Sequence, residues 1–236
     1  MSFIISVYTN EGIIMASDSR TTYTSQIQRL DGTIETQMGV QITDSTYKTF
    51  LCNKTIGLST CGTASINHIP ITGYIEKFIS EKVTEDSSVE YIAQEVLNYF
   101  LNISPNLDTH FLVAGYNPDD SQQHVVKVFV STRQIMPISA DVPGATWDGE
   151  TTTLQRVLKE VGLKNEKGTY VPLPNFPIGF NFFTLQDAID FAEYAVDITI
   201  KTMHFQNCIK TVGGPIDILA IKPNGAFWIQ RKELHA

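Results

Sequence analysis

The chain has 236 residues, of which 42% are hydrophobic and 18% are charged, proportions typical of a globular protein with a large core. Its formal net charge is −8, and its 17 basic residues form no cluster, which argues against nucleic acid or an anionic membrane as a partner. No segment is apolar over the length needed to cross a bilayer, so we expect no membrane and a cytoplasmic protein. At this length we expect one domain over residues 1–236.

The beginning of the chain predicts a β-hairpin. Residues 2–9 are apolar and β-branched, Asn10-Glu11-Gly12 is a turn signal, and residues 13–17 are apolar again. The opening lacks the basic residues of a signal peptide, which favours a strand. Residues 21–43 are polar with a turn at Asp31-Gly32, and they predict an extended loop or a projecting hairpin.

A second hairpin and two helices are predicted next. Residues 47–52 and 55–61 read as strands around a turn at Asn53-Lys54. A helix is expected over 63–81, kinked or restarted at Pro70. The following helix begins with a capping box from Ser87 to Glu90. Its apolar face consists of Tyr91, Ile92, Val96, Leu97 and Phe100.

The second half of the chain repeats the order of strands followed by helices. Strands are predicted over 110–116, 124–131 and 134–139, and a helix over 151–161. A stiff loop with several prolines precedes a long helix capped by Thr184 toward Asp187. A last hairpin, residues 216–221 and 226–230, surrounds the turn Pro223-Asn224-Gly225.

Helix pairs that separate antiparallel hairpins indicate two sheets packed face to face, with a helical layer on each outer side. The predicted fold class is therefore α+β, a four-layer αββα sandwich of two antiparallel sheets.

The sequence carries no familiar catalytic or metal-binding motif. It has no GxSxG elbow, no HExxH and no GxxxxGK. Its three cysteines, Cys52, Cys61 and Cys208, have neither metal-ligand spacing nor an even number, and we expect them to be buried free thiols. We therefore predict no metal and no cofactor.

Ser2 is the remaining candidate for chemistry. Once Met1 is removed, Ser2 carries both a hydroxyl nucleophile and a free α-amine. An α-amine has a pKa of about 7.7–8.0, which suits a general base near neutral pH. Maturation would then need only the loss of methionine, with no longer propeptide.

Three segments resemble proteasome β subunits and the related bacterial ring peptidases. The opening of the chain, from Ser2 through Asp18 to Arg20, is similar to the nucleophile strand of that family and the strand after it. Residues 48–64, from Lys48 to the turn at Gly62, are similar to its catalytic-lysine strand and oxyanion turn. Residues 212–218, Val-Gly-Gly-Pro-Ile-Asp-Ile, are similar to the segment that begins its last hairpin.

The resemblance implies the N-terminal-nucleophile (Ntn) hydrolase fold and a peptidase mechanism. Ser2 would attack an amide carbonyl, Lys48 would lower the pKa of the hydroxyl, and Asp18 would orient Lys48. The backbone N–H of Gly62 would stabilise the oxyanion. Without the resemblance, Asp18 and Arg20 read as an ion pair at a strand end, Lys48 as a solvated edge lysine, and Gly62 as a turn glycine.

The resemblance also implies a substrate pocket and partners. The pocket beside the nucleophile would be lined by the small residues Thr21, Thr46, Thr60 and Ala64. The substrate would be a peptide or protein with no strong preference for acidic side chains. The chain would form a homo-oligomeric ring, and an unfoldase partner stays open.

The sequence departs from the family where the terminal amine is oriented. The expected Gly-Ser-Gly-like turn and Asp-x-x-Ser pair are missing, and Thr146, Asn207 and Thr211 are candidate substitutes. Two alternatives to a peptidase stay open: an Ntn amidase that acts on a small acyl amide, and an inactive structural subunit of a ring.

Overall fold

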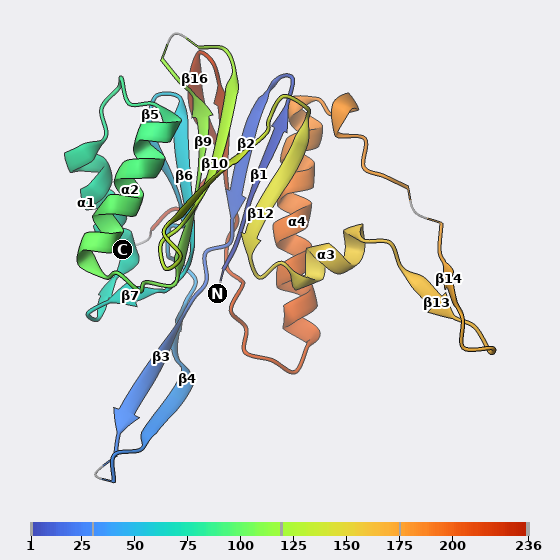
Figure 1. Cartoon of the computed structure of the whole chain (residues 1–236), viewed down its shortest axis with the longest axis horizontal. Coiled ribbons are helices and arrows are strands. Elements are labelled where there is room, and N and C mark those ends of the chain that lie inside the picture. Colours follow the sequence, from blue (N-terminus) through green and yellow to red (C-terminus); the bar gives the residue numbers. More distant parts are fainter. Residues whose placement is uncertain (1, 30, 119, 175, 235–236) are drawn as a thin grey trace.

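The computed structural model describes residues 2–29, 31–118, 120–174 and 176–234 (Figure 1). Met1, whose removal the expected chemistry requires, lies outside these residues. Within them the fold is α+β with antiparallel sheets and four α-helices, as the alternation of hairpins and helix pairs predicted. None of the helices in the described ranges has an apolar stretch long enough to cross a bilayer.

The first sheet contains the first and the last strand of the described residues. Its five strands are all antiparallel to their neighbours, and their order is β12 (Gly144–Gly149), β1 (Phe3–Thr9), β2 (Gly12–Ser17), β15 (Asp217–Lys222) and β16 (Gly225–Gln230). The predicted first and last hairpins are confirmed. Strand β1 is fully buried and lies between β12 and β2, so its beginning is held on both sides.

The second sheet is built from the middle of the chain. Its order is β11 (Gln134–Ile138), β10 (Gln123–Phe129), β9 (Thr109–Tyr116), β6 (Ile56–Gly62) and β5 (Thr49–Asn53). The two sheets face each other in Figure 1, and a buried cluster that includes Ile4, Met15 and Leu112 combines side chains of both.

Helices cover the outer sides of both sheets. α1 (Ile71–Lys82) and α2 (Val89–Ile103) lie over the second sheet, where Phe78 and Phe100 join its buried core. α3 (Thr152–Leu158) and α4 (Leu185–Phe205) lie beside the first sheet. The predicted cap at Thr184 begins α4. The structure shows a full capping box there, because the side chains of Thr184 and Asp187 each bind the backbone N–H of the other residue.

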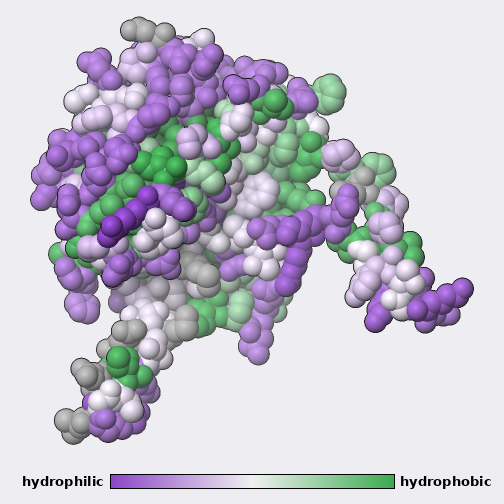
Figure 2. Space-filling view, in the orientation of Figure 1, coloured by the Kyte–Doolittle hydropathy of each residue, from purple (hydrophilic) through white to green (hydrophobic). Residues whose placement is uncertain are grey.

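Two hairpins project from this body. Residues 21–43 form a hairpin of β3 (Thr21–Gln28) and β4 (Ile34–Thr43), which decides between the loop and the hairpin left open by the sequence. A second, of β13 (Gly162–Lys164) and β14 (Tyr170–Pro172), was not predicted. Figure 2 shows apolar side chains on both projections.

The helix predicted over 63–81 is wrong in its first part. Ser65–Ile66 (β7) and Ile69–Pro70 (β8) form a small hairpin whose turn residues, Asn67 and His68, have positive φ angles of 50° and 64°. Positive φ is incompatible with a right-handed helix, and a proline restricts the residue before it to extended backbone. The helix therefore begins only after Pro70.

Smaller expectations are also corrected. The N-cap of α2 is Ser88, one residue later than predicted, and its side chain accepts a hydrogen bond from the Tyr91 N–H. Tyr91 itself is exposed and not part of the buried face. α3 is shorter than predicted, and strand β12 and the 3-10 turn Phe180–Phe182 were missed. Cys61 is buried, but Cys208 is exposed, so the expectation of three buried thiols is wrong.

Candidate active site

Ser2 lies at the beginning of β1 and is held by the end of β12. Its carbonyl oxygen accepts a hydrogen bond of 2.7 Å from the Glu150 N–H, and Ser2 is 6% exposed. Gly149 approaches so closely that a Cβ at that position would lie 1.9 Å from the Ser2 carbonyl oxygen. The φ of Gly149, +89°, is also one that favours glycine. The start of β1 is therefore fixed in place.

Asp18 follows the end of β2 and faces the start of β1. The hairpin register pairs Ile4 with Ser17, which places Asp18 beside Phe3. Its carboxylate is fully buried and accepts hydrogen bonds from the backbone N–H groups of Phe3 (3.0 Å), Arg20 (3.1 Å) and Gly213 (3.0 Å). Three backbone donors fix the orientation of this carboxylate.

Lys48 lies directly before β5 of the second sheet and meets Asp18, which follows β2 of the first sheet. Its Nζ lies 2.7 Å from Asp18 Oδ1, and Nζ also donates to the carbonyl oxygen of Arg20. Burial lowers the pKa of Lys48, and the nearby Asp18 carboxylate opposes that shift. Lys48 is 3% exposed, so the reading as a solvated edge lysine is wrong.

Gly62 ends β6 with a φ of +111°, in the region that favours glycine. A Cβ here would lie 2.3 Å from the Asp108 carbonyl oxygen, so no other residue fits without movement of the backbone.

One narrow pocket brings the predicted residues together. Its empty space, open mouth included, is about 350 Å³. Its lining contains the predicted Ser2, Lys48, Gly62, Thr21, Thr46, Thr60 and Ala64. Asp18 lies behind it, bound to Lys48. Their catalytic and binding roles stay predictions.

The pocket also contains residues that the sequence analysis did not select: Thr22, Tyr47, Cys61, Thr63 and Ile71. Except for Ile71, each adjoins a selected residue in the chain. Their position next to a selected residue was the only signal in the sequence that could have indicated them.

The three residues considered for orienting the terminal amine were Thr146, Asn207 and Thr211, and none of them lines the pocket. Thr146 pairs with Ser6, which is two side chains further along the same face of β1 than Ser2. Asn207 is exposed in the loop after α4, whereas Thr211 is buried with its hydroxyl 4.0 Å from the Met203 sulfur. The suggestion that Thr146 lies beside the amine is therefore wrong.

A second buried lysine–aspartate pair lies in the first sheet. The Lys232 ammonium binds the fully buried Asp217, and the Lys232 N–H donates to Oδ1 of the same carboxylate at 2.8 Å. Asp217 is the aspartate of the segment 212–218 singled out in the sequence. Neither residue lines the pocket. This pair is therefore buried like Lys48–Asp18, but it contributes no group to the pocket.

Comparison with known proteins gives a likeness of fold. Anbu from Hyphomicrobium sp. strain MC1 superposes with a TM-score of 0.64 at 14% identity, over 98% of this chain and 88% of the Anbu chain. A mutant of the same Anbu gives the same TM-score and identity, over 98% and 86%. These two comparisons show that the chain shares the fold of the Anbu structures.

The family assignment taken from the sequence needs correction. No protein-family model and no curated protein matches this chain. Three short segments in the right order were too little to assign the chain to the proteasome β subunits, and the structural likeness, at 14% identity, carries the fold alone.

Proposed function

We propose that the chain is an amide hydrolase with an N-terminal nucleophile, and that it cleaves peptide bonds. The observation that carries the proposal is the pocket in which Ser2, Lys48 and Gly62 meet, with Lys48 bound to the buried Asp18. Loss of Met1 would expose the α-amine of Ser2 next to its own hydroxyl.

The chemistry then follows from these groups. The Ser2 hydroxyl attacks the carbonyl carbon while the α-amine accepts its proton, and the amine later protonates the leaving nitrogen. The ammonium of Lys48 stabilises the developing alkoxide, and Asp18 keeps Lys48 charged and oriented. The N–H of Gly62 binds the oxyanion. Water releases the acyl group from Ser2 in a second step.

The same proposal includes the architecture and assembly. We infer a single domain over residues 1–236 with four layers in the order αββα, because helices pack on the outer side of each of two facing sheets. We also infer a homo-oligomeric ring, since the hairpin of β3 and β4 carries exposed apolar residues with no cover in one chain.

An amidase for a small acyl amide is the second candidate, favoured by the narrowness of the pocket. It would use the same residues. Peptides and small acyl amides compared at equal concentration distinguish the two.

The test is the intact mass of chain produced without an N-terminal tag, before and after treatment with an electrophile that bridges a hydroxyl and its own α-amine. We expect a mass one methionine short of the full chain, one adduct per chain, and no adduct in Ser2→Ala. Retained methionine or the absence of an adduct would overturn the proposal in favour of an inactive structural subunit.

A further inference from the structure

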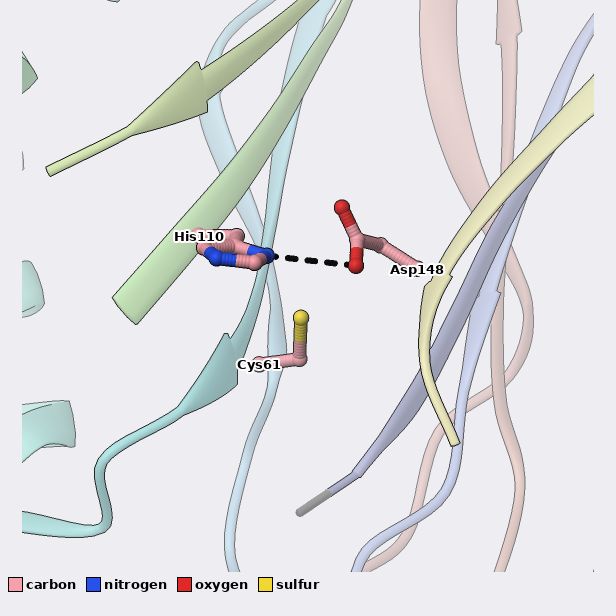
Figure 3. A group of neighbouring side chains, drawn as sticks. All are labelled: Cys61, His110 and Asp148. Atoms are coloured by element: carbon pink, nitrogen blue, oxygen red, sulfur yellow. Dashed lines mark hydrogen bonds and ion pairs between the residues drawn. The ribbon is translucent and has the colours of Figure 1, made fainter. Parts of the chain in front are cut away.

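A cysteine, a histidine and an aspartate from three strands converge beside the pocket. Cys61 lies on β6, His110 on β9 and Asp148 on β12, and one ligand atom of each lies within 4.8 Å of the others. The His110 Nδ1 is 3.2 Å from the Asp148 Oδ1. Figure 3 shows the sulfur of Cys61 pointing toward the gap between the ring and the carboxylate.

Strand pairing holds these three side chains in place. Cys61 and His110 are directly paired across β6 and β9, so their side chains lie on the same face of the second sheet. Asp148 pairs with Ile4, whose side chain belongs to the core between the sheets. The cluster therefore spans the two sheets on rigid elements, which suits a binding site that needs fixed geometry.

Other polar groups around the cluster support the carboxylate. The Gly149 N–H donates to Asp148 Oδ1 at 2.7 Å, and the Lys127 Nζ lies 3.9 Å from Oδ2. The Lys127 ammonium also donates to the Trp147 carbonyl oxygen, and this bond keeps the ammonium beside Oδ2 of Asp148. The Asp108 carboxylate lies 4.0 Å from the His110 Nε2. Ligating carboxylates and imidazoles are commonly held by such partners.

We propose that Cys61, His110 and Asp148 bind a divalent transition-metal ion, with Zn²⁺ as the best match. Thiolate, imidazole and carboxylate are its usual ligands, whereas Mg²⁺ and Ca²⁺ prefer oxygen alone. Tetrahedral bonds of about 2.0–2.3 Å place ligand atoms roughly 3.5 Å apart. The His110–Asp148 distance already matches this spacing, and small rotations would bring the sulfur into range.

Binding exchanges protons and leaves all oxidation states unchanged. The ion takes the place of the proton of the Cys61 thiol, and this proton goes to solvent. The ion also takes the place of the proton on His110 Nδ1: an imidazolium releases that proton to solvent and keeps the one on Nε2, whereas a neutral ring carries its one proton on Nε2 instead. Water completes the fourth position. The ion can enter from solvent, because the side chains of His110 and Asp148 are 29% and 18% exposed.

The experiment uses the full chain, freed of metal by a chelator, and Zn²⁺ or Co²⁺ alone as the probe. Calorimetry should show one Zn²⁺ per chain with proton release. Co²⁺ should give the near-ultraviolet charge-transfer band of a thiolate ligand, and Cys61→Ser should abolish that band. His110→Gln and Asp148→Asn should each weaken the affinity at least about tenfold.

Matched controls locate the site. Cys208→Ser removes an exposed thiol, and His124→Gln removes another histidine bound by carboxylates, so neither should change the spectrum or the affinity. Circular dichroism checks that every variant is folded. A band that survives in Cys61→Ser, a band lost in Cys208→Ser, or preference for Mg²⁺ over Zn²⁺ would overturn the proposal.

The metal proposal is independent of the proposed hydrolysis. Ser2→Ala removes the nucleophile but none of the three ligands, so it should bind Zn²⁺ as the unmodified chain does. Loss of binding in Ser2→Ala would contradict the assignment of the ligands, whereas loss of hydrolysis alone would leave it intact.

Discussion

The Nζ of Lys48 lies 2.7 Å from the Oδ1 of Asp18, and neither residue is more than 3% exposed. Asp18 directly follows a strand of the first sheet and Lys48 directly precedes a strand of the second, so the pair links the two sheets beside the pocket. A buried charge pair of this kind is costly unless further hydrogen bonds satisfy it, and here three backbone N–H groups bind the carboxylate. An arrangement with this cost suggests a role beyond stability.

Lys48→Ala should lower the kcat of hydrolysis by about 10²–10⁴-fold, because the group that lowers the pKa of the Ser2 hydroxyl is lost. It should also destabilise the chain by about 3–5 kcal/mol, since Asp18 remains buried without its partner. Lys232→Ala is the variant for comparison. It breaks the other buried lysine–aspartate pair and should lose stability, but hydrolysis per folded chain should fall far less than in Lys48→Ala, because Lys232 reaches the pocket only through the ring of Tyr47. Unchanged activity in Lys48→Ala would falsify the mechanism.

Gly62→Ala should reduce hydrolysis because the added Cβ meets the Asp108 carbonyl and displaces the N–H that binds the oxyanion. The strained backbone should cost about 1–3 kcal/mol of stability. Gly115→Ala is the control. Gly115 lies near the end of β9 that is far from Gly62, and its added Cβ would meet a backbone carbonyl oxygen just as closely, 2.2 Å from that of Thr55. If both variants lose activity only in proportion to their folded fraction, Gly62 has no role in the reaction.

Acidic and neutral fluorogenic peptides should be cleaved with kcat/KM values within about tenfold of each other. This corresponds to a difference in activation free energy below about 1.4 kcal/mol. Lys48 is the only charged residue among the described lining, and Asp18 already binds its ammonium. Thr46→Lys adds a cation to the lining and should create a preference for acidic peptides. A clear acidic preference in the unmodified chain would contradict the pocket assignment.

Replacement of residues 25–37 by a two-residue Asn-Gly turn should leave the body folded but reduce the size of the assembly measured by light scattering. A two-stranded hairpin is marginally stable alone in water, and Ile27, Ile34 and Val40 are exposed on this one. We expect the hairpin to pack on a second copy of the chain. An assembly of unchanged mass would show that it does not.

His124 should make stability depend on pH. Its Nδ1 lies 2.7 Å from Glu90 Oε1 and its Nε2 lies 2.9 Å from Asp120 Oδ2. Burial would lower the pKa of His124, but the two carboxylates outweigh it and raise the pKa above its ordinary value of 6.5.

A raised pKa means that this stabilisation is complete below pH 6.5 and is lost as the pH rises through the folded-state pKa. His124→Gln should therefore cost stability near pH 6, by at most about 1 kcal/mol, and less at pH 8. Urea unfolding at both pH values measures this. An equal cost at both would mean that the charge of His124 contributes nothing.

Local chemistry along the chain determined much of what the sequence predicted. Two runs of apolar and β-branched residues and the turn at Asn10-Glu11-Gly12 predicted the first hairpin, and the register of that hairpin places Asp18 beside the start of β1. The cap at Thr184 likewise predicted the start of α4. Each of these depends on residues close together in the chain, so the sequence contains the whole signal.

Packing between distant segments decided the rest. Asn67 and His68 carry no apolar pattern, and their positive φ angles exclude the first part of the helix predicted over 63–81. Strand β12 is short and polar at its end, and only its pairing with β1 makes it a strand. That pairing brings Asp148 to Cys61 and His110, three residues that share no motif.

The sequence by itself thus determined the local elements, because turns, caps and runs of apolar residues act over a few residues. The pocket residues were selected through the resemblance and not through local chemistry, and part of the lining was missed. Only the tertiary structure decided that Lys48, beside a strand of one sheet, meets Asp18, beside a strand of the other, and that Cys61, His110 and Asp148 converge. Those contacts depend on how the two sheets pair and face each other, which no local pattern specifies.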